Sequence, residues 1–380
     1  MSAIYIHIPF CRQACSYCDF YFVTRKQLLP DFVTRICRNI RSYADSIYAA
    51  EPVETLYVGG GTPSQLQEKH IEAILNALSD TFTLRLKEFT FEINPDDVSS
   101  NYLATLKQLG VTRPSMGIQS FNPKLLAFMH RAHSSNEAEE ALDMLKKAEF
   151  PTYSVDLIYG NPSQSLDELE EDISKFLQCD PPHISAYSLT IEPNTRLGRQ
   201  KKMGRLQPLD EDAASRHYDY VVERLNRAGI HQYEISNFAK EGHRANHNCR
   251  YWHHKNYLGF GPASHSFWWD RSTTTAKRWN IKPDIRNYLA DASHIPLENT
   301  EYLEPHQLAE ERIMLGLRTT GGLSISTLKK QYKYTFNAGQ WKYIKNLCAK
   351  GFMQLEDGKL RLTHKGLRIA DTITVDILSK

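Results

Sequence analysis

Three cysteines near the start of the chain have a spacing suited to metal ligands. Cys11, Cys15 and Cys18 lie within residues 4–20, IYIHIPFCRQACSYCDF, as C-x3-C-x2-C. Three thiolates this close together can hold one corner of a cubane iron–sulfur cluster, which leaves one iron without a protein ligand. Clusters that only carry electrons usually have four cysteine ligands. The spacing therefore predicts a cluster with an open coordination site.

Two alternatives use the same three cysteines. They could belong to a zinc site that lacks one ligand, or to a stripe at i, i+4, i+7 on a buried helix. Pro9 and the polar residues Arg12, Gln13 and Ser16 argue against the helix. A cluster is the favoured prediction.

A strand must position the cysteine loop. Residues 4–8 are apolar in alternation and predict a strand that Pro9 ends. Further strands are predicted at 53–58, 89–93, 114–119, 153–159 and 183–189, and helices at 28–49, 64–80, 99–109, 135–148 and 165–177. This alternation predicts an α/β fold with a parallel sheet. A doubly wound sheet has the same pattern, but the cysteine loop favours a partial (β/α)6 TIM-like barrel.

Polar residues lie at the predicted carboxyl ends of these strands. The second strand runs into GGGTPS (59–64), in which glycines permit close approach of a ligand to the backbone. Carboxylates on apolar strands are costly unless paired. The residues at or near these strand ends are Gly60, Gly61, Thr62, Glu92, Gln119 and Asp156. Because these ends meet at one rim, we expect a binding site there.

The remaining chain divides into three predicted parts: a barrel at 1–230, a barrel extension at 231–302 and a small helical, winged-helix-like domain at 303–380. The stretch 191–208 is predicted to be a solvated loop, although its five basic residues also fit an acidic partner. A helix is expected at 210–229 and a strand at 233–240. The third part is expected to hold helices at 306–317, 323–331 and 339–350, and a hairpin at 352–363.

Composition narrows the class of protein. The 380 residues carry a net charge of +2, so no nucleic-acid partner is expected. The seven cysteines are odd in number and four of them are scattered, so they do not indicate a disulfide framework. The sequence enters its first strand directly and holds no apolar run long enough to span a membrane. We expect a cytoplasmic protein with no transmembrane segment, and a peripheral membrane contact stays open.

Several motifs together resemble one family. YIHIPFC…C…CDF, GGGTPS, FEINP, GIQSFN and VDLIYGNP are similar to the oxygen-independent coproporphyrinogen III oxidase family of radical S-adenosylmethionine (SAM) proteins, which carry C-x3-C-x2-C. The resemblance implies a [4Fe–4S] cluster on Cys11, Cys15 and Cys18, with SAM on its open iron. It implies SAM contacts from Tyr5, Gly60, Gly61, Thr62 and Glu92. Gln119, Arg131 and Asp156 match residues that surround a second SAM in the oxidases, and Thr190 matches there only loosely.

Two departures point to a sister group within that family. Phe20 stands where the oxidases have another cysteine, and three residues precede the first strand where the oxidases have a long segment. The haem chaperone (HemW-like) proteins share both features and carry H-N-x-x-Y-W, found here as residues 247–252. The resemblance implies a haem chaperone that hands haem to an acceptor protein.

We expect His247, Tyr251 and Trp252 to contact haem. His247 could instead be structural, and four histidines nearby are rival ligands: His243, His253, His254 and His265. The alternative functions are oxidation of coproporphyrinogen III, which is not expected, and SAM chemistry on an unrelated small molecule. Whether the chain acts as an enzyme stays open.

Overall fold

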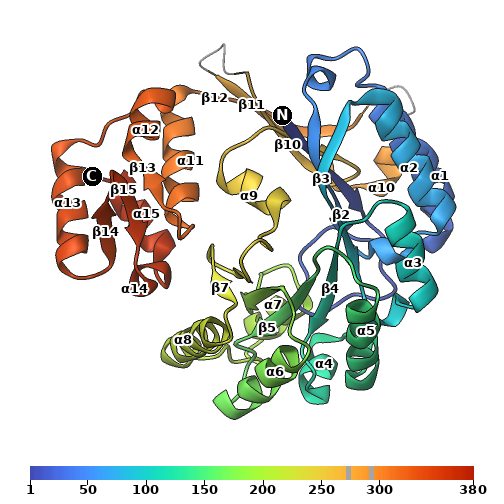
Figure 1. The fold of residues 1–380 in the computed structure, drawn as a ribbon, viewed down its shortest axis with the longest axis horizontal. Coiled ribbons are helices and arrows are strands. Elements are labelled where there is room, and N and C mark those ends of the chain that lie inside the picture. The colour runs from blue at the N-terminus through green and yellow to red at the C-terminus, as the bar shows by residue number, and fades with distance from the viewer. Residues whose placement is uncertain (271–274, 291–294) are drawn as a thin grey trace.

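The computed structural model describes residues 1–270, 275–290 and 295–380. Its centre is a sheet whose strand order, in the described chain, is β12-β11-β10-β9-β1-β2-β3-β4-β5-β6-β8-β7 (Figure 1). Six neighbouring strands are parallel and follow chain order: β1 (Ser2–Ile8), β2 (Val53–Gly60), β3 (Leu84–Ile93), β4 (Arg113–Gln119), β5 (Ser154–Tyr159) and β6 (His183–Ser188).

Helices connect these strands: α1 (Leu29–Arg41), α2 (Glu68–Thr81), α3 (Ser100–Gln108), α4 (Pro123–Met129), α5 (Ser135–Lys147) and α6 (Leu166–Gln178). Local sequence fixes their starts. At α5, the Ser134 hydroxyl accepts from the Glu137 amide while the Glu137 carboxylate accepts from the Ser134 amide, at 2.7 Å. The buried faces of these helices pack on the sheet. The predicted partial (β/α)6 TIM-like barrel is confirmed.

Later segments extend the sheet at both edges. On one side, β9 (Tyr257–Phe260) pairs parallel with β1, and β10 (His265–Trp269), β11 (Ala276–Ile281) and β12 (Leu297–Leu303) follow antiparallel. On the other, β8 (Asn237–Ala239) and β7 (His231–Gln232) continue from β6. Helices α8 (Glu211–Arg227) and α10 (Ile285–Ala290) flank these additions.

Helix α9 (Asn246–Trp252) lies against β2 and β3. The buried carboxylate of Glu88 accepts hydrogen bonds from the backbone amides of Asn246 (2.7 Å) and His247 (2.8 Å). A carboxylate at a helix amino terminus is favourable because it satisfies free amides and the positive end of the helix dipole. In Figure 1 this helix stands between the barrel strands and the carboxyl-terminal helices.

The carboxyl-terminal part has its own core and a three-stranded antiparallel sheet in the order β13-β15-β14. Its strands are β13 (Leu323–Ser324), β14 (Met353–Glu356) and β15 (Lys359–Leu362), and its helices are α11 (Pro305–Leu317), α12 (Ile325–Tyr332), α13 (Ala338–Ala349), α14 (His364–Leu367) and α15 (Ala370–Leu378). The winged-helix-like prediction is confirmed. Phe267 and Trp269 of β10 join this core. The three domain boundaries stay predictions, and residues 271–274 and 291–294 of the second part lie outside the described residues.

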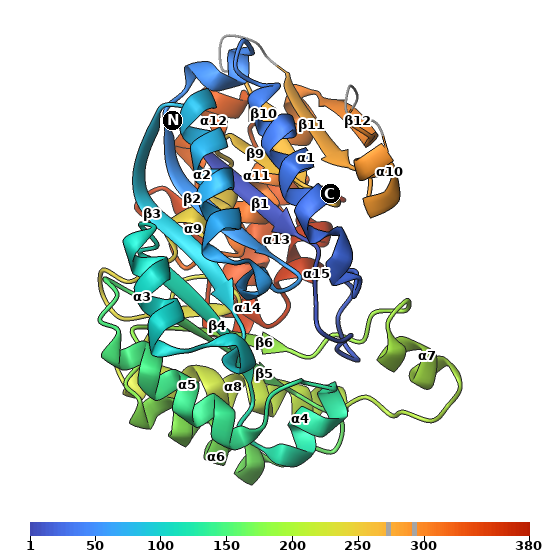
Figure 2. The ribbon, with the colours of Figure 1, turned by 90° about the vertical axis from the view of Figure 1, so that its right-hand side faces the viewer.

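Three local predictions were wrong. Residues 191–208 contain a helix, α7 (Arg196–Lys202), which Figure 2 shows at the right. At its amino-terminal cap, the Thr195 hydroxyl accepts from the Gly198 amide at 3.0 Å. The stretch 233–240 forms only the short strand β8, because the chain turns there to pair with β7. The helix expected over 28–49 ends at Arg41. Over the described residues, no helix has the length and apolar character needed to cross a membrane.

Candidate cofactor site

The cysteine loop is held in place by contacts with segments far away in the sequence. Ser16 donates from its amide to the Met129 carbonyl (3.0 Å) and from its hydroxyl to the Phe128 carbonyl (2.9 Å). Its own carbonyl accepts from the Leu197 amide at the start of α7, at 3.0 Å. The loop between the second and third cysteines is therefore fixed between the end of α4 and the start of α7.

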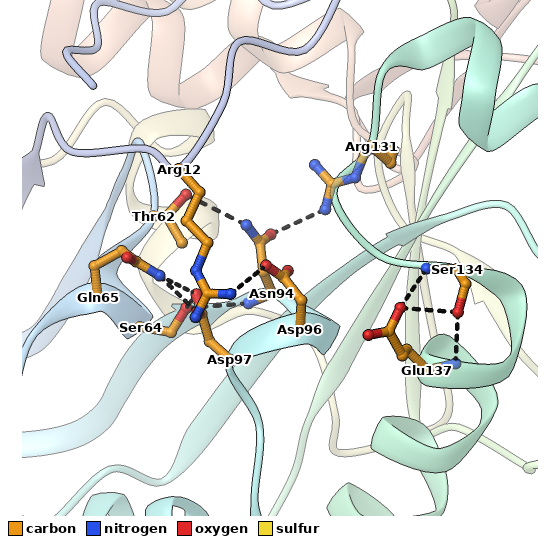
Figure 3. Close-up of polar contacts among 10 residues, drawn as sticks. All are labelled: Arg12, Thr62, Ser64, Gln65, Asn94, Asp96, Asp97, Arg131, Ser134 and Glu137. Carbon is orange, nitrogen blue, oxygen red and sulfur yellow. Dashed lines mark hydrogen bonds and ion pairs between the residues drawn. The ribbon is translucent and has the colours of Figure 1, made fainter.

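An ion pair holds the other half of the loop. The Arg12 guanidinium lies 2.5 Å from Asp97 and 3.4 Å from Asp96, just after β3 (Figure 3). Asp97 also accepts from the Ser64 hydroxyl (2.7 Å) and from the side-chain amide of Gln65 (2.6 Å). This network joins the cysteine loop to the ends of β2 and β3.

The three cysteines open on one cavity of about 580 Å³ at the carboxyl ends of the parallel strands. Two sulfurs accept weak hydrogen bonds, Cys11 from Thr62 and Cys15 from Arg131, each at 3.5 Å. Burial raises the pKa of Cys11 to about 11 and that of Cys18 to about 12. A thiolate is thus favoured there only when a metal cation compensates the charge.

Most predicted site residues line this same cavity: Tyr5, Cys11, Cys15, Cys18, Gly60, Gly61, Thr62, Glu92, Gln119, Arg131, Asp156, Thr190, His247 and Tyr251. Trp252 is the exception. It does not line the cavity, and its carbonyl accepts from Arg312 of α11 at 2.5 Å.

The glycines at the end of β2, Gly60 and Gly61, have no room for side chains. A Cβ at Gly60, where φ is +112°, would lie 2.7 Å from the His7 ring, and a Cβ at Gly61 would lie 3.0 Å from the Cys11 sulfur. The backbone therefore comes closer to the cysteine loop than other residues would allow. It forms a cradle beside the cysteines that a ligand can approach.

Glu92 lies beside this cradle. Its carboxylate accepts from the Tyr57 hydroxyl (2.7 Å) and the Gly60 amide (3.0 Å). Burial raises the pKa of Glu92 to about 7 and that of Asp156 to about 6. A bound cationic group would favour the ionised form of both carboxyls.

Arg131 and Asn94 connect two sides of the cavity (Figure 3). The Arg131 guanidinium donates to the Asn94 side-chain oxygen (2.9 Å) and the Gly117 carbonyl (2.6 Å), and Asn94 donates to Thr62 (3.3 Å). Several side chains that line the cavity each have one buried polar atom without a hydrogen-bond partner in the described chain, among them Oε1 of Gln119, Nε of Arg131 and Oδ1 of Asp96. Buried polar atoms of this kind are costly unless something pairs with them. This fits a cavity built for a polar ligand.

His247 is fully buried, and both ring nitrogens are bonded within the protein. Nδ1 lies 3.0 Å from the Thr55 hydroxyl and Nε2 lies 2.7 Å from the Tyr251 hydroxyl. Burial lowers the pKa of His247 to about 3, so the ring is neutral. In this geometry the ring could bind a metal only after one of these bonds broke, which favours the structural alternative.

Sequence reasoning missed several residues of the site. Tyr57, Asn94 and Arg12 line the cavity, and His7 supports the Gly60 turn. Asn94 lies in the FEINP motif and Arg12 lies in the cysteine loop, so both could have been predicted as site residues from these motifs. Tyr57 and His7 lie on strands, where they resembled ordinary alternating residues.

Comparisons with known proteins agree with this site. A family model described as the radical SAM superfamily matches residues 5–176, and one described as the HemN C-terminal domain matches residues 303–369. The solved structure of coproporphyrinogen III oxidase (HemN) from Escherichia coli, described as a radical SAM enzyme, superposes with a TM-score of 0.84 at 20% identity, covering 99% of this chain and 89% of that chain. At that identity the likeness shows the fold. Barrel and cysteine loop together are those of a radical SAM protein, a class that implies a [4Fe–4S] cluster and SAM.

Curated relatives define the family more closely. The chain is 32% identical to the heme chaperone HemW of Bacillus subtilis (strain 168), over 98% of both chains. It is 30% identical to the mitochondrial radical S-adenosyl methionine domain-containing protein 1 of Bos taurus, over 100% of this chain and 88% of that protein. The chain belongs to the HemW family.

Proposed function

We propose that this protein is a haem chaperone: it holds a [4Fe–4S] cluster on Cys11, Cys15 and Cys18, binds SAM beside it, and passes haem to an acceptor protein. The observation that carries the proposal is the cavity. Three cysteines, a glycine cradle and side chains with unpartnered polar atoms line it, in a chain related to proteins named heme chaperones.

The residues present fit a cluster and SAM. Three sulfurs can ligate three irons, which leaves the fourth for SAM, and Arg131 supplies positive charge near Cys15. Tyr5, Gly60, Gly61, Thr62 and Glu92 would hold SAM. When reduced, such a cluster can supply an electron that cleaves SAM. The protein's own part is to orient SAM and to hold the cysteine loop in place through residues such as Arg12 and Ser16.

Gln119, Arg131 and Asp156 lie across the cavity from the cradle strand. The unpartnered Oε1 of Gln119 and Nε of Arg131, and the raised pKa of Asp156, support a second polar ligand there. A second SAM at these residues remains a proposal, as do the acceptor protein and the cytoplasmic location.

The proposal of haem binding rests on relatives that are named heme chaperones and on the H-N-x-x-Y-W motif. The test uses the full chain, reconstituted anaerobically with iron and sulfide and titrated with haem by Soret absorbance. We expect saturable binding near one haem per chain. In a parallel sample with coproporphyrinogen III, SAM and dithionite, we expect no protoporphyrinogen IX. Product that is lost in Cys11→Ala would overturn the proposal in favour of an oxidase.

A further inference from the structure

The cofactor cavity extends along the whole of strand β4. Alternate residues of this strand, Arg113, Ser115, Gly117 and Gln119, all line it, as expected for positions on one face of a strand. Gln119 lies at the carboxyl end of the strand, and Arg113 is its first residue. Arg113 therefore lies at the inner end of the cavity, where branched apolar side chains usually fill a TIM-type barrel.

Arg113 is a buried cation without a counter-charge. Its side chain is 2% exposed, and in the described chain no carboxylate oxygen lies within 4.0 Å of its guanidinium. One terminal nitrogen donates to Nδ1 of His183 at 3.1 Å, while Nε is buried without a partner. A guanidinium has five N–H donors, and a buried charge is costly unless it is compensated. Arg113 therefore has donors and charge available for a ligand.

Two titratable groups beside Arg113 do not supply the missing charge. Burial lowers the pKa of His183 well below its usual range, so this ring is neutral. Burial raises the pKa of Asp156 to about 6, and its hydrogen bonds come from Ser185 and Ser115 rather than from Arg113. The inner end of the cavity thus holds a guanidinium and a carboxyl group that do not form an ion pair with each other.

A carboxylate is the ligand group that fits Arg113 best. Its two oxygens match the paired N–H groups of a guanidinium, and its charge would compensate that of the arginine. A cationic group on the same ligand would in turn favour the ionised form of Asp156. The amino-acid end of SAM carries both groups, whereas a haem propionate supplies the carboxylate alone.

We propose that the inner end of the cofactor cavity is a carboxylate-binding subsite, in which Arg113 binds a carboxylate of a ligand other than the SAM on the cluster. The inference rests on the proposed function for the two ligands that could supply this group, a second SAM and haem. The subsite itself follows from the position of Arg113 in the cavity and from its unpartnered donors.

The experiment replaces Arg113 by methionine, a long side chain without charge, in the full chain after anaerobic reconstitution. Equilibrium dialysis with labelled SAM counts the SAM bound per chain. A Soret titration measures haem affinity, with haem dimethyl ester as a probe that lacks free carboxylates. If the carboxylate comes from SAM, Arg113→Met should bind about one SAM fewer than wild type. If it comes from haem, the variant should bind haem about tenfold more weakly, while both proteins bind the diester alike.

Arg35→Met is the matched control. Arg35 is 6% exposed, does not line the cavity and donates to the Tyr288 carbonyl at 2.8 Å, so it is a buried arginine with a structural role. This variant should unfold at lower urea concentration and keep wild-type binding of both ligands. Arg113→Met should do the opposite. Its urea midpoint should not fall, because an uncompensated buried charge is removed and His183 keeps its hydrogen bond with Ser154 at 2.7 Å.

The outcomes separate this inference from the function on which it rests. If wild type binds no haem, the chaperone proposal fails, but loss of one SAM in Arg113→Met would still support the subsite. If wild type binds a single SAM and no haem, no carboxylate reaches the inner end and the subsite is wrong. Wild-type binding of SAM and haem by the folded variant would also overturn it, and a lower urea midpoint would then assign Arg113 to the scaffold.

Discussion

The cysteine loop and helix α9 line the same cavity but treat their metal-binding side chains differently. Around the cysteines, the contacts that fix the loop come from its other residues, such as Arg12 and Ser16, while the sulfurs accept only long hydrogen bonds. In α9, the imidazole of His247 is itself part of the support, because both nitrogens bond to the protein. A side chain that must bind an external group is positioned by contacts of neighbouring residues, so its own ligand atoms stay available. A side chain whose polar atoms all hydrogen-bond to the protein has none left for a ligand.

The largest effect is expected at the cysteine loop. Cys15→Ala should lose most of the iron that anaerobic reconstitution gives the wild type, which is about four irons per chain. A cubane with two protein ligands is exposed to solvent and chelators. The measurement is iron and sulfide content with the visible spectrum. The control is Cys37→Ser, because Cys37 lies on the buried face of α1, does not line the cavity, and donates to the Ala73 carbonyl of α2. Full loading of Cys15→Ala would contradict the cluster assignment.

The next effect concerns Glu92. We expect Glu92→Gln to weaken SAM binding about tenfold at pH 8, because the amide cannot attract the cationic groups of SAM. With a pKa of about 7, Glu92 is mostly protonated at pH 6 and mostly ionised at pH 8. Wild-type affinity should therefore rise across this range, while that of the variant stays flat. Equilibrium dialysis with labelled SAM measures both. Parallel pH profiles in the two proteins would exclude Glu92 from the SAM site.

A third prediction tests whether His247 of α9 has a structural role. His247→Ala should lower the free energy of unfolding by about 2–4 kcal/mol, because it leaves a cavity and removes the partners of Thr55 and Tyr251. The pH dependence has a definite sign. The folded pKa, about 3, lies below the unfolded value near 6.5, so unfolded chains bind the extra proton between these values. This contribution to stability is present above pH 6.5 and is lost as pH falls towards 3.

Urea denaturation of wild type and variant at pH 7 and pH 5 measures this prediction. The difference in the free energy of unfolding between wild type and variant should be smaller at pH 5. At that pH the unfolded chain gains a proton on His247 that the folded wild type does not bind, which lowers the stability of the wild type. Unchanged stability in His247→Ala at pH 7 would mean that the ring is free for a ligand, and the contrast with the cysteine loop would disappear.

Much of this arrangement could be predicted from local sequence patterns. Strand–helix alternation gave the barrel, and residues at strand ends met at one rim because parallel strands end together. Helix α7 was harder to predict, because its sequence is short and basic. Its helical conformation is supported by the cap at Thr195 and by a hydrogen bond to the distant Ser16 carbonyl. Trp252 was assigned to haem by motif, although side chains of consecutive helical residues point in different directions. A second cavity, of about 930 Å³, brings together residues from Met1 to Asp270, which no local pattern connects.

The smallest effect is expected at Arg12, which supports the cysteine loop without ligating anything. Its guanidinium is 48% exposed, whereas Asp97 is 3% exposed and keeps bonds to Ser64 and Gln65 when the arginine is removed. Partly exposed ion pairs contribute roughly 0.2–1 kcal/mol. Arg12→Gln should therefore load iron fully but lose it two- to fourfold faster to an added chelator, because the loop opens more often. Gln13→Ala, which removes one bond from the same loop to the His130 carbonyl, is the matched variant and should behave alike. If either variant failed to load iron at all, the substituted residue would be needed to form the cluster site. The distinction between cysteines that ligate the cluster and residues that only position the loop would then be wrong.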